Sequence, residues 1–111
     1  DFLFLRAVER LVQLIVDEIV DLNKHLIRNL SLKLPEDTQS TFYVLAEGDI
    51  LDREFARKIA PVVGLRNRLV HRYEKVDPSI MLTHLRKNHD DFKRYIKEIY
   101  GFLEKEVSDG R

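Results

Sequence analysis

The chain has 111 residues, of which 44% are apolar and 34% charged, and its 19 Lys and Arg balance 19 Asp and Glu. This length predicts one domain over residues 1–111, and the absence of Cys excludes disulfides, thiolate metal sites and cysteine nucleophiles. Its apolar runs are shorter than the roughly 18 to 20 residues that a membrane span requires, so we expect a cytoplasmic protein with no membrane association.

The first predicted element is one long amphipathic helix over about 2–30. Apolar residues recur there at spacings of three and four, and the expected inward stripe is Phe4, Val8, Leu11, Ile15, Ile19, Leu22, Leu26 and Leu30. Residues 31–35 end this helix.

A shorter helix is predicted from about Asp37 to Glu47, with Gly48 as its C-cap. The residues expected to turn inward are Thr41, Val44 and Leu45.

Asp52 is the expected N-cap of a third helix that runs from Arg53 to about Glu74. Pro61 lies inside this segment and removes one backbone donor. We therefore predict a kink just before Arg66.

The last helix begins with the pair Asp77 and Pro78, an N-cap followed by proline at the first helical position. Its apolar seam, spaced by three and four, is Leu82, Leu85, His89, Phe92, Ile96, Ile99 and Leu103. His89 is interpreted as a core histidine paired with a polar neighbour, because that is the more common role of a histidine on an apolar stripe. The fold class is therefore all-α, an up-and-down helical bundle.

Charge is unevenly distributed along the chain. Residues 36–49 hold four acids and no Lys or Arg, whereas residues 52–75 hold seven basic and three acidic residues. The basic segment would attract an anionic ligand, although a helix with solvated basic positions has the same composition.

The search for common enzyme motifs finds no phosphate-binding glycine loop and no nucleophile elbow. The four histidines do not form a recognised metal-binding spacing, so we expect no metal and no cofactor.

One octapeptide, residues 66–73 (RNRLVHRY), contains several side chains that can bind phosphate or transfer protons at it. Its guanidiniums match phosphate oxygens, and its imidazole titrates near neutral pH. Together they can cleave RNA without a metal: His71 would move protons at the ribose 2′-hydroxyl or the leaving 5′-oxygen, and a guanidinium would stabilise the charge on phosphorus. The alternative is a basic helix end in which His71 and Tyr73 only complete the packing.

Helix geometry constrains this site. On an ideal helix Asn67 lies about 40° from His71, but Arg66 lies about 140° away. The long reach of arginine, a distortion after Pro61, or a two-fold dimer could bring Arg66 and His71 to one phosphate. We favour the dimer.

Residues 66–73 resemble the Arg-x4-His-x-Tyr signature of the HEPN superfamily, specifically of HepT-like toxins paired with minimal nucleotidyltransferase antitoxins. Residues 42–48 and 59–65 before the motif, and residues 77–78 and 89–92 after it, are also similar to the family pattern.

The resemblance implies a metal-independent endoribonuclease that acts on RNA as a homodimer, with Arg66 and His71 as the catalytic pair and Asn67 in support. Tyr73 would accept adenylyl groups from the partner nucleotidyltransferase, which would block the RNA site. Arg68 and Arg72 are assigned to RNA backbone contacts.

The chain departs from the family pattern at its start, because the family usually has a further helix before the segment that opens here. Some HEPN proteins are also non-catalytic interaction modules. Two alternatives therefore stand beside the nuclease: a helical module that binds a nucleotidyltransferase, and a structural helical dimer with no role in RNA chemistry.

Overall fold

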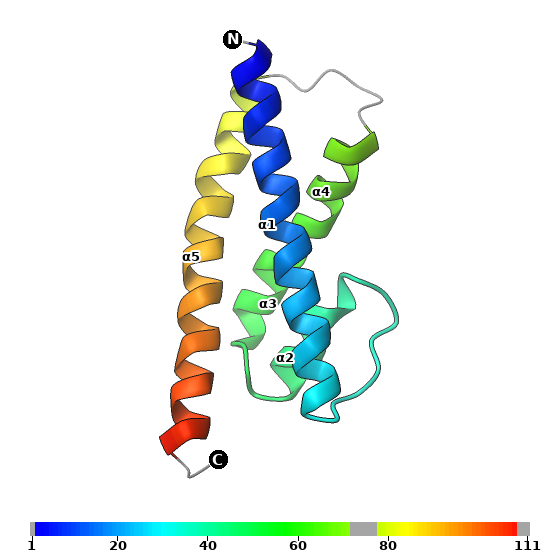
Figure 1. Ribbon diagram of the computed structural model, residues 1–111, viewed down its shortest axis with the longest axis vertical. Coiled ribbons are helices and arrows are strands. Elements are labelled where there is room, and N and C mark those ends of the chain that lie inside the picture. The colour runs from blue at the N-terminus through cyan, green and yellow to red at the C-terminus, as the bar shows by residue number, and fades with distance from the viewer. Residues whose placement is uncertain (1, 72–77, 109–111) are drawn as a thin grey trace.

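The first helix, α1 (Phe2–Asn29), and the last, α5 (Pro78–Ser108), run side by side in the same direction (Figure 1). Between them, α2 (Ser40–Glu47), α3 (Arg53–Ile59) and α4 (Val62–His71) return the chain toward the start of α1. This computed structural model describes residues 2–71 and 78–108, and within those ranges every regular element is an α-helix. The predicted all-α bundle is confirmed.

The extent of α1 agrees with the prediction, and its buried face agrees in part: Ile19 and Leu26 are buried, and Ile15 and Leu30 pack against the core. The apolar residues that it buries are Val12, Val16, Ile19, Val20, Leu26 and Ile27. Phe4 and Leu11, which belong to the predicted stripe, are 70% and 58% exposed. The buried sector is rotated because α1 packs against α2 and α4 as well as α5, so its contacts extend past the predicted stripe.

Helix α2 begins at Ser40, three residues later than predicted. Asp37 closes the turn before it, because its Oδ1 accepts hydrogen bonds from the backbone N and the Oγ of Ser40 at 2.7 and 2.6 Å. These two hydrogen bonds lower the pKa of Asp37, and the one from the Ser40 hydroxyl has the larger effect. The residues predicted to turn inward are buried: Thr41, Val44 and Leu45.

Gly48 is the C-cap of α2, as predicted, yet its φ of −84° is one that any residue can adopt. The left-handed residue is Asp49, at φ 62°. Close packing is the constraint at Gly48, because a Cβ there would lie 3.1 Å from Cδ1 of Leu32.

Asp52 is the N-cap of α3, as predicted, and its Oδ2 accepts a hydrogen bond of 3.0 Å from the N–H of Phe55. Such a cap contributes about 1 kcal/mol. The prediction of one kinked helix from Arg53 is wrong, because the chain breaks into α3 and α4 at Ala60 and Pro61. Proline has no N–H to donate to the preceding turn. The helical hydrogen bonding begins again after it, where the N–H of Gly64 donates to the carbonyl of Pro61 at 3.0 Å.

Pro78 begins α5 as predicted, and the expected cap Asp77 lies outside the described residues. The predicted seam is only half buried. Ile99 is buried, and Leu85 and Phe92 pack against the core, but the other line is exposed: Leu82, His89, Ile96 and Leu103. The most buried line of α5 is instead Asn88, Asp91, Tyr95 and Ile99. Only one face of α5 meets the other described helices, so the remaining half of its wide apolar sector faces solvent.

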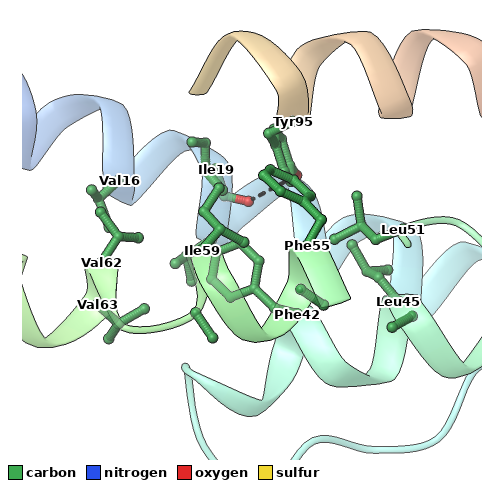
Figure 2. Packing of buried hydrophobic residues seen from close by; sticks show 14 of the residues in the cluster. Val16, Ile19, Phe42, Leu45, Leu51, Phe55, Ile59, Val62, Val63 and Tyr95 are labelled. Carbon is green, nitrogen blue, oxygen red and sulfur yellow. Dashed lines mark hydrogen bonds between the residues drawn. The ribbon is translucent and has the colours of Figure 1, made fainter. Parts of the chain in front are cut away.

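The core lies where α1, α2, α3 and α5 meet (Figure 2). The ring of Tyr95 packs edge-to-face on Phe42 with centroids 6.3 Å apart, and its hydroxyl donates to the side-chain oxygen of Asn23. The amide of Asn23 in turn donates to Oγ1 of Thr41 at 3.1 Å. Burial raises the pKa of Tyr95, so the hydroxyl keeps its proton. This buried polar chain joins α1, α2 and α5 in one register.

Candidate functional site

Helix α4 carries the start of the predicted motif, residues 66–68, outside its buried face. Its inner face is fixed by burial of Val62, Val63, Leu65 and Leu69. This packing against α1 leaves Arg66 half-buried at the rim and turns Asn67 and Arg68 toward solvent. The position of the break at Pro61 therefore decides which face of the motif is exposed.

Arg66 is held by two neighbours. Its Nε donates to Oδ1 of Asp17 on α1 at 2.8 Å, and its Nη1 donates to Oδ1 of Asn67 at 3.2 Å. An arginine has five N–H donors, so its bonds within residues 2–71 and 78–108 leave Nη2 for another acceptor. Arg66 and Asn67, both of which belong to the candidate site predicted from the sequence, are therefore in direct contact.

A groove of about 600 Å³ opens beside Arg66, between α1, α4 and the turn that precedes α2. Asp17, Asp21 and Lys24 form one wall, because residues three, four and seven apart share a face of α1. Opposite them, the turn contributes Asp37, Thr38 and Gln39. The lining thus combines three carboxylates, two cations and two carboxamides.

The rest of the motif is described less fully. His71 is the last residue of α4, but its side chain lies outside the described residues, as do Arg72 and Tyr73. Because Arg66 and His71 belong to one continuous α-helix, the break at Pro61 does not change the angle between them. A distortion after Pro61, one of the three routes considered from the sequence, therefore leaves the helical spacing between positions 66 and 71 unchanged.

His89 lies away from this site and is not a core residue. Its side chain is 71% exposed, and Nδ1 lies 3.5 Å from Oδ1 of Asp90 on the same helix. The interpretation of His89 as a buried histidine is wrong, because it belongs to the line of α5 that faces solvent.

Sequence reasoning missed Asp17, Lys24 and Gln39. Asp17 precedes Arg66 by 49 residues, so no local pattern connects them. The available signal was the polar face of α1, where Asp17, Asp21 and Lys24 recur with helical spacing next to apolar residues.

The fold and the arginine-bearing α4 place the protein among the HEPN helical bundles. The structure is similar to that of a tri-AMPylated Shewanella oneidensis HEPN toxin in complex with MNT antitoxin, with a TM-score of 0.82 and 25% identity over 91% of this chain and 76% of that one. Residues 1–99 match the profile of the family described as Ribonuclease HepT-like, and the chain belongs to this family.

Two curated relatives are nucleases. The chain is 35% identical over 95 residues to the tRNA nuclease HepT of Aphanizomenon flos-aquae, covering 86% of this chain and 65% of that protein. It is 25% identical over 99 residues to the mRNA nuclease HepT of Shewanella oneidensis, covering 89% of this chain and 74% of that protein. The chain therefore spans about two thirds to three quarters of their length. In the described ranges no helix is long and apolar enough to cross a membrane.

Proposed function

We propose that this protein is the toxin of a toxin–antitoxin pair and cleaves RNA without a metal. The observation that carries the proposal is the placement of Arg66. Its guanidinium is oriented by Asp17 at the rim of a groove, with Nη2 directed to no acceptor among the described residues. A fixed guanidinium with a free edge suits a phosphate oxygen, and the chain belongs to a ribonuclease family.

In this mechanism Arg66 holds the scissile phosphate and stabilises the charge that develops on phosphorus. His71 takes the proton of the ribose 2′-hydroxyl or gives one to the leaving 5′-oxygen. Asn67 supports Arg66 through the 3.2 Å hydrogen bond to Nη1. Arg68, which is exposed, and Arg72 contact the RNA backbone.

The proposed active unit is a homodimer in which Arg66 of one copy acts with His71 of the other. The continuous helix α4 supports it, because positions 66 and 71 lie about 140° apart around the axis of an ideal helix. Mixing inactive Arg66→Ala and His71→Ala variants under exchange conditions tests the arrangement. A shared site would restore about a quarter of the parent activity, since half of the dimers would hold one complete site out of two. Sites complete within one copy would stay inactive.

We further propose that a minimal nucleotidyltransferase antitoxin adenylylates Tyr73 and so blocks the RNA site by bulk and negative charge. RNA and such an antitoxin meet in the cytoplasm, where we place the protein. Incubation with the antitoxin and ATP should add adenylyl mass to the parent and none to Tyr73→Phe, as read by mass spectrometry.

The decisive experiment is cleavage of a mixed tRNA and mRNA pool by the full chain in EDTA, prepared without the antitoxin. We expect the parent to cleave and His71→Ala to be inactive at unchanged helicity by circular dichroism. His89→Ala is the matched control, because it removes an exposed histidine from α5. Equal cleavage by parent and His71→Ala would contradict the assignment. No cleavage by either would favour a module that binds a nucleotidyltransferase without cutting RNA.

A further inference from the structure

The groove beside Arg66 is poorly suited to a run of phosphates. Its lining contains three carboxylates, from Asp17, Asp21 and Asp37, against the two cations Lys24 and Arg66. A channel that tracks the RNA backbone needs excess positive charge, because each phosphate brings one negative charge. The lining instead offers acceptor oxygens, which match the N–H donors on the edges of nucleobases.

Asp21 and Gln39 both line the groove, and their side chains have no hydrogen-bond or ion-pair partner within residues 2–71 and 78–108. Asp21 makes no hydrogen bond or ion pair there, unlike Asp17 with Arg66 and Asp37 with Ser40. Gln39 occupies the N-cap position of α2, but its backbone is helical and its side chain makes no capping hydrogen bond. Its half-buried carboxamide therefore remains available to a ligand in the groove.

Three apolar residues also line the groove between its polar walls. Val16, Val20 and Val63 are largely buried, with 1%, 8% and 7% exposure. The small apolar surface that they leave open can contact the face of a base whose polar edge is directed at the walls.

We propose that this groove binds the base next to the scissile phosphate and reads its exocyclic amine through Asp21 and Gln39. Adenine and cytosine present an amine donor to these oxygens, whereas uracil presents a carbonyl oxygen that repels a carboxylate. Lys24 lies seven residues beyond Asp17 on the same wall, about 10.5 Å along α1, and pairs with a neighbouring phosphate. The inference rests on the proposed function, since Arg66 sets the position of the phosphate.

Binding and cleavage are measured separately to test it. Fluorescent tetranucleotides of A, C or U with 2′-O-methyl riboses cannot supply the attacking hydroxyl, and fluorescence anisotropy gives their Kd for the full chain. We expect the U oligonucleotide to bind roughly 10-fold more weakly than A or C. Asp21→Asn and Gln39→Leu should each reduce this ratio to below about 3. Both residues lie at the surface or rim, and circular dichroism confirms that each variant folds.

Lys24→Met should weaken binding of all three oligonucleotides alike and reduce the salt slope by about one. Lys97→Met is the matched control, because it removes an exposed lysine from α5. Equal binding of A, C and U by the parent, no binding of any, or an unchanged ratio in both Asp21→Asn and Gln39→Leu would overturn the inference. Cleavage of the RNA pool by the parent decides the proposed function independently of these constants.

Discussion

Replacement of Asp17 by Asn separates the orientation of Arg66 from the stability of the bundle. The two side chains are 42% and 34% exposed, and the distance from Nε to Oδ1 is 2.8 Å. Solvent screens a pair this exposed, and such pairs contribute about 0.2 to 1 kcal/mol. The free energy of unfolding should therefore fall by less than about 1 kcal/mol, which lowers Tm by at most about 8 °C in a chain of this size.

The effect of Asp17→Asn on cleavage should be larger than its effect on stability. Asparagine lacks the charge that fixes the guanidinium, and misplacement of a catalytic group by about 1 Å costs up to about 100-fold in rate. We expect kcat to fall roughly 10- to 100-fold with KM nearly unchanged. Single-turnover cleavage measures the effect on the rate, and urea denaturation measures the effect on the free energy of unfolding. Glu18→Gln on the exposed face of α1 is the control. If kcat stayed within about twofold of the parent while Arg66→Ala was inactive, Asp17 would have no positioning role.

Two further predictions concern the scaffold that holds the site. Asn23→Leu leaves the buried hydroxyl of Tyr95 only its longer hydrogen bond of 3.4 Å to the carbonyl of Ile19, so the free energy of unfolding in urea should fall by about 1 to 3 kcal/mol; an unchanged midpoint would show that this second acceptor suffices. The folded-state pKa of Asp37 is lowered by its bonds from Ser40, so the stability it contributes is present above its unfolded pKa and is lost as pH falls through its folded pKa. Asp37→Asn should reduce the loss of Tm on acidification below about pH 4, and an identical acid profile in parent and variant would contradict this assignment.

Helix ends were predictable where one residue decides them. Asp52 caps α3 with its own carboxylate, and Pro78 begins α5 where a missing N–H has no cost. Pro61 was identified as a disturbance, but the sequence did not distinguish a kink from a break. The difference depends on whether α3 and α4 gain more by packing separately, and that gain comes from the contacts of α3 with α2 and of α4 with α1.

The rotation of α1 and α5 about their axes was not predictable in the same way. Both helices carry more apolar residues than one contact face can bury, so the spacing of these residues is compatible with several rotations of each helix about its axis. Ile96 is 59% exposed although it continues the seven-residue repeat, whereas Asn88 and Asp91 are buried. Contacts with neighbouring helices determine the rotation of each helix, and polar groups such as the hydroxyl of Tyr95 contribute to these contacts.

The charge of the candidate site could not be read from its own segment. Residues 52–75 carry an excess of four positive charges, but the fold brings acids from other helices against them. Nζ of Lys58 lies 3.6 Å from Oδ1 of the buried Asp91 on α5, and Arg66 is paired with Asp17 of α1. Fewer cations therefore remain for phosphates than the local sequence indicates, and RNA binding should show a shallow dependence on salt. With little affinity available from phosphates, selection of RNA has to depend on contacts with the bases, which is where the carboxylates and Gln39 of the groove can act.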